Sequence, residues 1–204
     1  SSDLSALRII SDFKALDNVE CPDLRYVMFS GEVMPVKSVR YWREKVPSAR
    51  YVNLYAPSEI TYNCTYYEIT EDLKDDEMLP IGKAFRNCRV TLRDSERKTV
   101  NDPNVTGEIC VSGTCLAMGY WNNKEQTDKV FIDDPEITEY HSRMYCTGDL
   151  GFYNEAGELV FVSRQDYQIK HMGHRIELGE IEVVVNMHKG IRTNCCILDR
   201  KSVV

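Results

Sequence analysis

Three short segments of this chain, each predicted to be a loop just after a buried strand, carry residue types that could bind a nucleotide. They are Ser30–Pro35, Asn53–Glu59 and Tyr145–Leu150. Ligands of open α/β sheets bind at the carboxyl ends of strands. Together the segments offer an aromatic ring, hydroxyl groups, a carboxylate for a hard cation and another for a sugar diol, which are the groups that a magnesium–nucleotide site needs. Any one segment alone would equally be an ordinary strand-to-helix turn, so the prediction rests on all three.

Helices and strands alternate in the first part of the chain, where two of these segments lie. Residues 3–17 have apolar positions at helical spacing, and Leu24–Phe29 is a short apolar run that indicates a buried strand. Pro35 can open a second helix in its first turn, and Arg50–Leu54 is a second buried run. The order helix, strand, helix, strand predicts a parallel sheet with crossover helices.

The pattern becomes rich in short strands from residue 61 onward. The predicted strands are Thr61–Ile69, Arg89–Arg93, Glu108–Ser112, Leu150–Asn154 and Leu159–Val162. Asn154–Gly157 supplies a hairpin turn between the last two. We therefore expect a small, mostly antiparallel barrel or sandwich after the α/β part.

The last part of the chain predicts a third, smaller unit of mixed type. Gln168–Lys170 looks extended, Leu178–His188 has a helical pattern that stops before Gly190, and Thr193–Leu198 has the composition of a strand. The expected fold class is α/β: a parallel α/β subdomain, a small β-barrel-like subdomain and a small α+β C-terminal unit. The predicted boundaries are 1–70, 71–165 and 166–204.

The composition argues against several classes of partner. The chain is 43% hydrophobic and 28% charged, with a formal net charge of −7 and no cluster of Lys and Arg, so we expect no nucleic-acid partner. No apolar run approaches the roughly 18 residues that would suggest a membrane span. Without such a run we expect no membrane partner. The chain opens with the polar residues Ser1, Ser2 and Asp3, so we expect no signal peptide. The cysteines, interpreted below as reduced thiols, favour a cytoplasmic location.

The eight cysteines form no CxxC pair, and several stand in apolar runs such as Ile109–Val111. We interpret them as buried, reduced thiols, with a disulfide framework or a zinc site as the alternatives. His171 and His174 make an HxxH pattern, but Gly173 lies between them and no cysteine pair matches it, so a metal site there is not expected.

Four segments resemble, in the right order, the motifs of the adenylate-forming (AMP-binding) superfamily. They are Asn53–Glu59 (compare N-x-Y-G-P-T-E), Gly107–Gly113 with Met118–Tyr120 (G-E-L-x-x-x-G…GY), Tyr145–Leu150 (Y-x-T-G-D-L) and Ser163–Glu182 (G-R-x-D-x-Q-V-K…G-x-R-I-E-L-G-E-I-E). The last block is most similar to the amino-acid-activating branch, which comprises peptide-synthetase adenylation domains and D-alanine–carrier-protein ligases.

The resemblance implies an ATP-dependent, AMP-forming ligase. Such an enzyme activates an amino acid as an aminoacyl-adenylate and transfers it to the phosphopantetheine thiol of an acyl or peptidyl carrier protein. The implied cofactors are ATP or AMP, Mg²⁺ and the carrier's phosphopantetheine, and the implied partners are a small-molecule amino acid and the carrier protein. Two alternatives stay open: an acyl-CoA or aryl-CoA synthetase, and a non-catalytic nucleotide-binding or interaction module.

The resemblance also implies roles on the adenine side of the site. Gly31 and Glu32 would bring backbone against the adenine ring, where a Cβ at position 31 would obstruct a close approach. Tyr55 would stack on adenine, and Asn53 would hydrogen-bond the exocyclic amine. For Tyr55, a plain core aromatic is the alternative.

Further roles are implied on the phosphate and ribose side. The Ser58 hydroxyl would reach a phosphate oxygen, and Glu59 would ligate Mg²⁺ through its carboxylate. Asp149 would accept from both ribose hydroxyls, and Arg164 would add a donor to the ribose or the phosphates.

The C-terminal unit would then be the start of a lid domain, with Asp166 as its hinge. Lys170 would lie in the segment that rotation presents to the site, and it completes the implied catalytic set with Ser58 and Glu59. The substrate pocket would involve Met28, Ser30, Leu54, Tyr62 and Asn63. An ordinary strand is the alternative for the last two.

Two substitutions and two absences set this sequence apart from the family pattern. Ala56 stands in place of a glycine, which would matter if that position needs a positive φ, and Ser163 replaces another glycine. The sequence holds no Ser/Thr/Gly-rich phosphate loop ending in Lys-Gly and no late catalytic lysine. We therefore expect this chain alone not to complete adenylation. We also expect self-association through apolar surface that the rest of such an enzyme would cover.

Overall fold

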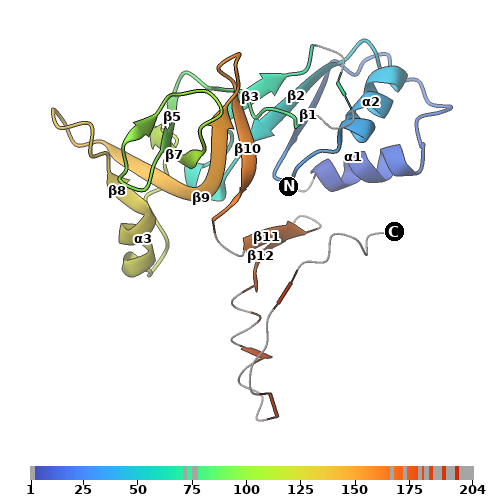
Figure 1. The fold of residues 1–204 in the computed structure, drawn as a ribbon. Coiled ribbons are helices and arrows are strands. Elements are labelled where there is room, and N and C mark those ends of the chain that lie inside the picture. Colours follow the sequence, from blue (N-terminus) through green and yellow to red (C-terminus); the bar gives the residue numbers. More distant parts are fainter. Residues whose placement is uncertain are drawn as a thin grey trace.

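The computed structural model describes residues 3–70, 73–74, 78–165, 168–171, 174–178, 181, 184–185, 190–191 and 196–197 (Figure 1). Most of them belong to two sheets, a mixed sheet with two helices and a larger antiparallel sheet. A short two-stranded ribbon follows. The predicted α/β fold class is confirmed in this arrangement.

The first sheet has four strands in the order β1-β2-β3-β4. The strands are β1 (Tyr26–Ser30), β2 (Arg50–Tyr55), β3 (Thr65–Glu68) and β4 (Lys83–Ala84), and the helices are α1 (Asp3–Asp12) and α2 (Val36–Lys45). β1 and β2 are parallel, as predicted, whereas β3 and β4 join antiparallel. Pro35 stands at the start of α2, as predicted.

One face of this sheet packs against the two helices. Successive side chains of a strand point to opposite faces, and Val27 and Phe29 are accordingly buried while Met28 is exposed. Trp42 of α2 fills the same core and donates from Nε1 to the Leu7 carbonyl at 3.0 Å. Each large apolar side chain buried here contributes about 1.5–3 kcal/mol.

Two predicted elements near this sheet differ from the structure. The first helix ends at Asp12 and not at residue 17, because Lys14 adopts a left-handed φ of 50° and Phe13 points to solvent, 80% exposed. The predicted strand Thr61–Ile69 begins only at Thr65, since Thr61 is left-handed after the short helix η1 (Ser58–Ile60). That strand pairs with β2, so it belongs to the first sheet.

The second sheet has six antiparallel strands in the order β10-β9-β7-β5-β6, with β8 also pairing with β9. They are β5 (Cys88–Arg93), β6 (Thr99–Val100), β7 (Gly107–Gly113), β8 (Phe131–Asp133), β9 (Arg143–Tyr153) and β10 (Leu159–Arg164). The predicted hairpin turn between β9 and β10 is confirmed, with Asn154 Oδ1 accepting from the Ala156 and Glu158 amides at 3.0 and 2.8 Å.

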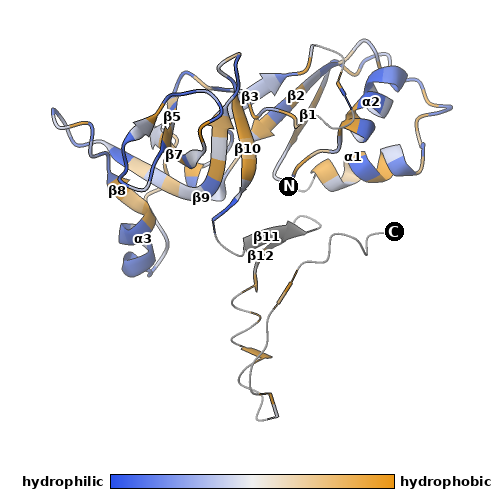
Figure 2. Ribbon diagram, in the orientation of Figure 1, coloured by the Kyte–Doolittle hydropathy of each residue, from blue (hydrophilic) through white to orange (hydrophobic). Residues whose placement is uncertain are grey.

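Strand β9 is longer than the predicted run Leu150–Asn154, and it contains Tyr145–Leu150. The prediction that this segment is a loop after a buried strand is therefore wrong. Met144, Tyr145 and Cys146 are buried and pair with β7, which draws the segment into the sheet. Helix α3 (Lys124–Val130), in contrast, is largely hydrophilic and has no buried residue (Figure 2).

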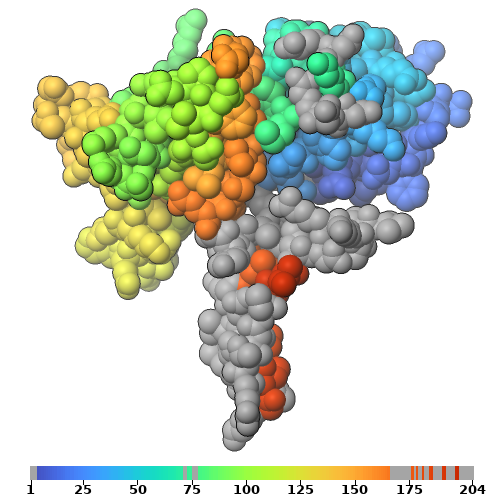
Figure 3. All heavy atoms as spheres, viewed as in Figure 1, coloured from blue at the N-terminus to red at the C-terminus, as the bar shows by residue number. Residues whose placement is uncertain are grey.

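The two sheets are joined directly, and the space-filling view shows them side by side (Figure 3). The Ile81 and Gly82 amides both donate to the Leu159 carbonyl, at 2.7 and 3.1 Å. Gly82 has φ +80°, and a Cβ there would overlap the Tyr66 carbonyl, so this junction requires glycine. β4 lies beyond residue 70 yet pairs with β3, so the first sheet includes residues after position 70. The division of the chain into the domains 1–70, 71–165 and 166–204 stays a prediction.

The C-terminal ribbon consists of β11 (Gln168–His171) and β12 (His174–Glu177), which confirms the predicted extended segment. Four described residues of the predicted helix 178–188 are helical: Leu178, Ile181, Val184 and Val185. The strand predicted for 193–198 is not seen at its two described residues, Cys196 and Ile197. Ile197 is 79% exposed, so it gains none of the burial that stabilises a core strand.

Seven of the eight cysteines are described, and all seven are free thiols. Five of them are buried, namely Cys64, Cys88, Cys110, Cys115 and Cys146, in line with the predicted buried and reduced thiols. Within the described part of the chain, no helix has the length and apolarity to cross a membrane.

Candidate functional site

Strand β9 contains a bulge at Thr147–Asp149. The register with β7 passes from Cys110 opposite Cys146 to Glu108 opposite Leu150, so two steps along β7 correspond to four along β9. A bulge re-aims the side chains that it carries, and bulges are frequent beside binding sites. The position of the Asp149 side chain is therefore determined by the pairing of β9 with β7 and not by a loop.

Hydrogen bonds from β7 fix the bulge. The Thr147 hydroxyl donates to the Ile109 carbonyl at 2.7 Å and accepts from the Asp149 amide at 3.0 Å. Glu108 Oε1 accepts from the Gly148 amide at 3.0 Å. Gly148 has φ +71°, which a glycine adopts without strain.

The Asp149 carboxylate is the centre of the predicted site, and it is 5% exposed. Its Oδ1 accepts from Arg164 Nη1 of β10 at 2.6 Å, and its Oδ2 accepts from the Tyr55 hydroxyl of β2. Burial, together with the adjacent Asp149 charge, holds the pKa of Tyr55 well above its usual value, so this hydroxyl stays a donor at neutral pH. The structure thus brings three predicted residues from both sheets together.

Glu59 lies in η1 and is 5% exposed. Its Oε1 accepts from the Tyr120 hydroxyl at 2.7 Å, and its backbone carbonyl accepts from the Ala117 amide at 2.8 Å. Carboxylate oxygens are the ligands that Mg²⁺ prefers. Glu59 therefore fits the predicted metal ligand, with the exposed Ser58 beside it.

Tyr120 was not among the predicted site residues, although it stands in the Gly119–Tyr120 motif. Its amide donates to Thr127 Oγ1 of α3 at 2.9 Å, and its ring packs edge-on against Phe131 at 6.0 Å between centroids. Gly119 has φ +138°, and a Cβ there would overlap the Thr127 side chain. Helix α3 therefore positions Tyr120 against Glu59.

The residues predicted to lie beside adenine are in β2 or directly follow β1. Gly31 has φ +95°, and a Cβ there would meet no atom within 4 Å, so open space adjoins its backbone. Asn53 is buried and donates from Nδ2 to the Pro80 carbonyl at 2.8 Å, so its amide oxygen is the atom that could accept from an adenine amine. Glu32 is half-buried. The φ of Ala56 is not positive, so the turn at this position forms without a glycine.

Three predicted pocket residues share one face of the first sheet. Met28 and Ser30 alternate with the buried residues of β1, and Ser30 is opposite Leu54 in the β1–β2 register. Tyr62, 78% exposed, and the half-buried Asn63 lie between η1 and β3. The strand alternative for these last two is wrong, because β3 begins after them.

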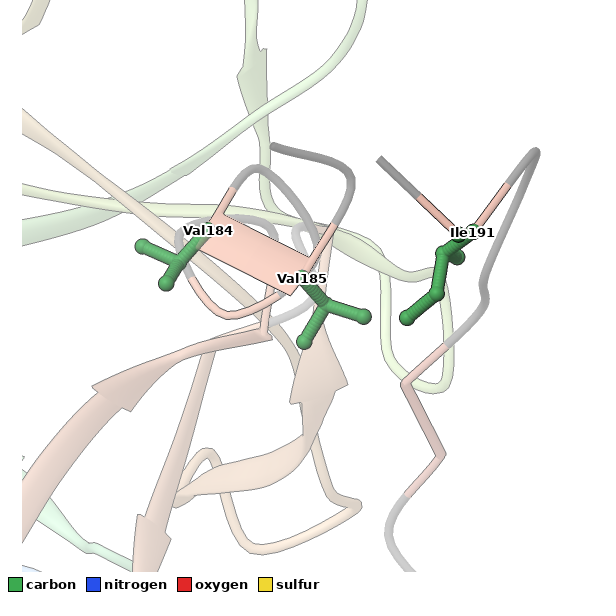
Figure 4. A pocket seen from close by; sticks show the side chains of 4 residues that line it. Val184, Val185 and Ile191 are labelled. Carbon is green, nitrogen blue, oxygen red and sulfur yellow. The ribbon is translucent and has the colours of Figure 1, made fainter. Parts of the chain in front are cut away.

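Two predicted site residues are not placed as side chains. Lys170 lies in β11, where only the backbone is described, and Asp166 lies outside the described residues. A hollow in the C-terminal part is lined by Val184, Val185, Gly190 and Ile191 (Figure 4). Its lining is apolar and includes none of the predicted site residues, so we assign it no role in nucleotide binding.

Comparison with known proteins gives a consistent set of relatives. The family model described as AMP-binding enzyme matches residues 5–121. The L-proline--[L-prolyl-carrier protein] ligase of Streptomyces coelicolor is 38% identical over 197 residues, 96% of this chain and 35% of that protein. The D-alanine--D-alanyl carrier protein ligase of Bacillus licheniformis is 37% identical over 84% of this chain and 33% of its own length. The chain thus spans about a third of the length of these curated relatives.

Solved structures agree with these relatives. IdnL1 superposes with a TM-score of 0.83 at 32% identity, covering 95% of this chain and 39% of that one. PA1221, described as an NRPS protein containing adenylation and PCP domains, superposes with a TM-score of 0.77 at 33% identity, covering 84% of this chain and 34% of that one.

Proposed function

The chain belongs to the family of AMP-binding enzymes, and from that premise we propose that it forms part of an ATP-dependent ligase that activates an amino acid and passes it to a carrier protein. The names of the two carrier-protein ligases above support the choice of an amino acid and a carrier protein as its substrates. Both are similar to this chain over most of its length.

The observation that carries the proposal is the buried Asp149 carboxylate between Tyr55 and Arg164. An ionised carboxylate can accept from two hydroxyls at once, which suits the ribose diol of a nucleotide. Arg164 holds this carboxylate in place and adds positive charge where phosphates would lie. Tyr55 brings an aromatic ring to the same point, on which adenine would stack.

Two steps make up the proposed reaction. In the first, a carboxylate oxygen of the amino acid bonds to the α-phosphorus of ATP, and the bond from that phosphorus to the bridging oxygen breaks, releasing pyrophosphate. In the second, the phosphopantetheine thiolate bonds to the acyl carbon and AMP leaves with the electron pair of the broken carbon–oxygen bond. Both steps depend on positioning and on charge stabilisation.

The residues of this chain would position the reactants for the first step. Glu59 would hold Mg²⁺, which when bound neutralises charge on the phosphates. Ser58 would donate its hydroxyl to a phosphate oxygen, and Asn53 would orient the adenine through its amide oxygen. The phosphate loop that the family also uses is not in this sequence, so we propose that the chain does not complete adenylation by itself.

The amino-acid side chain would rest on the face of the first sheet that carries Met28, Ser30 and Leu54. Small and medium side chains there suit a small or moderately polar amino acid.

The same face of the first sheet also carries Tyr26 and Tyr66, which are 49% and 42% exposed, and this apolar surface supports self-association of the isolated chain. Asp166 and Lys170 would serve as the hinge and as part of the rotating segment in the second step.

The test is pyrophosphate exchange with a panel of acids, run on this chain and on the whole product of its gene. We expect exchange by the whole product with one or a few amino acids, and none by this chain. Exchange that responds only to fatty or aryl acids would replace amino-acid activation with an acyl-CoA or aryl-CoA synthetase. No exchange with any acid, together with nucleotide binding, would favour a non-catalytic nucleotide-binding module.

A further inference from the structure

Three potential metal ligands meet beneath the β9 bulge. Glu108 and Cys110 project from β7, and Cys146 lies on β9. All three are buried, and their ligand atoms lie within 4.8 Å of one another. Among the residues that the structure describes, no other three His, Cys, Asp or Glu side chains lie close enough together to hold a metal ion.

Strand pairing produces this arrangement. Cys110 and Cys146 are register partners on adjacent antiparallel strands, so their side chains stand on the same face of the sheet. Glu108 is two residues before Cys110, and side chains at that spacing share a face. The bulge adds residues only to β9, so Glu108 remains beside the cysteine pair.

The sulfur atoms have the spacing of a tetrahedral metal site. Cys110 Sγ and Cys146 Sγ are 3.8 Å apart. Two thiolates that each lie about 2.3 Å from a tetrahedral zinc ion are about 3.8 Å apart. The pair could therefore bind such an ion without a change in sulfur separation, and Glu108 would supply a third ligand.

The guanidinium group of Arg97 already lies against two of these three side chains. Arg97 Nη1 contacts the Glu108 Oε2 carboxylate oxygen and lies 3.3 Å from Cys146 Sγ. The Arg97 side chain is 38% exposed and begins in the turn between β5 and β6, so it can move into solvent. The Glu108 oxygen that Arg97 would release is not the one that accepts from Gly148. A metal ion could thus replace the guanidinium and leave the bulge intact.

We propose that Glu108, Cys110 and Cys146 bind a thiophilic divalent cation such as Zn²⁺ or Cd²⁺, which enters by displacing Arg97. Both thiols lose a proton to solvent, two metal–sulfur bonds and one metal–oxygen bond form, and the contacts of Arg97 break. Water would complete the tetrahedron. Thiolate ligands select zinc and cadmium over the hard cation Mg²⁺, so this site is distinct in chemistry from Glu59. The inference is independent of the proposed ligase function.

The experiment is a titration of this chain with Co²⁺ alone in a thiol-free reductant, followed by displacement with Zn²⁺. Tetrahedral thiolate-bound cobalt gives a sulfur-to-metal charge-transfer band and intense visible bands. We expect both bands to saturate at a single equivalent of Co²⁺ and to disappear when Zn²⁺ is added. Absence of the charge-transfer band in the unchanged chain would overturn the proposal.

Four variants locate the site. Cys146→Ser and Glu108→Gln should weaken Co²⁺ binding, and Cys146→Ser should also reduce the intensity of the charge-transfer band. Arg97→Gln should tighten Co²⁺ binding because it removes the competing cation. Cys115→Ser is the matched control, since it removes a buried thiol from another cluster. Circular dichroism checks that each variant is folded. If Cys146→Ser or Glu108→Gln does not fold, the change in Co²⁺ affinity of Arg97→Gln still tests the proposal. A spectrum lost in Cys115→Ser and kept in Cys146→Ser, or unaltered affinity in Arg97→Gln, would contradict the proposal.

Discussion

The Tyr120 hydroxyl donates a hydrogen bond to Glu59 Oε1 at 2.7 Å, although the two residues are 61 positions apart in the chain. Tyr120 is itself held by Thr127 and Phe131. Because these contacts fix the phenol, the phenol fixes the rotamer of the proposed magnesium ligand. Tyr120 is therefore a positioning residue for Glu59.

Tyr120→Phe removes the donor and retains the ring. A hydrogen bond to a charged group contributes about 1.5–3 kcal/mol, so we expect Mg²⁺ to bind the nucleotide complex at least about tenfold more weakly. Titration calorimetry of Mn²⁺ or Mg²⁺ into the complex with nucleotide measures this directly. Binding of AMP without metal should be unchanged.

Tyr140→Phe is the control for this variant, because Tyr140 is 65% exposed and should have no effect on metal affinity. Equal metal affinity in Tyr120→Phe and the unchanged chain would show that the Tyr120 contact does not position Glu59 for a metal.

Glu136 makes the stability of the second sheet depend on pH. Its carboxylate accepts from the Thr99 hydroxyl and amide at 2.6 and 2.8 Å and pairs with the buried Arg93 at 2.6 Å. The hydrogen bonds from Thr99, with a smaller effect of Arg93, lower the pKa of Glu136 to about 2. A carboxyl whose pKa is lowered by folding stabilises the folded state above its unfolded pKa, and the effect is lost as pH falls toward its folded pKa.

Glu136→Gln should therefore flatten the decrease in unfolding free energy between pH 4.5 and about 2, the unfolded and folded pKa values of this carboxyl. Urea unfolding at a series of pH values measures it. Glu155→Gln is a control at an exposed carboxylate. A pH profile identical to that of the unchanged chain would mean that the Glu136 contacts contribute nothing to stability.

Gly82 tests the junction between the two sheets. Gly82→Ala places a Cβ against the Tyr66 carbonyl and a side chain at φ +80°, so we expect a loss of stability of about 2–4 kcal/mol. Gly157→Ala is the matched control: its φ is +71°, but a Cβ there meets no atom within 4 Å. We expect about 1–2 kcal/mol for that variant, from backbone strain alone. Equal losses in the two variants would contradict a steric requirement at Gly82.

Much of the fold follows from local sequence patterns. The apolar runs that form β1, β2, β7 and β10 and the hairpin turn after Tyr153 are short-range signals, and all were predicted. Helix α3 was missed because none of its residues is buried, although Asn123 caps it by accepting from the Gln126 amide. A capping residue three positions before a glutamine was the available signal.

The parts that could not be predicted depend on contacts between distant residues. The position of Asp149 depends on a register change against β7, which no local pattern at Tyr145–Leu150 reveals. The role of Tyr120 depends on its contact with Glu59 across the chain. The residue types of the proposed nucleotide site were therefore identifiable from the motifs, whereas their supporting contacts required the fold.

The most direct test of the central claim is calorimetric binding of AMP and of 2′,3′-dideoxy-AMP to this chain and to Asp149→Asn. If Asp149 binds the ribose diol, the unchanged chain should prefer AMP, and Asp149→Asn should lose at least about tenfold in affinity for AMP, since one such hydrogen bond contributes about 1.5–3 kcal/mol. Its affinity for dideoxy-AMP should not change. An equal loss for both nucleotides, or no binding of AMP by the unchanged chain, would contradict a ribose site at Asp149.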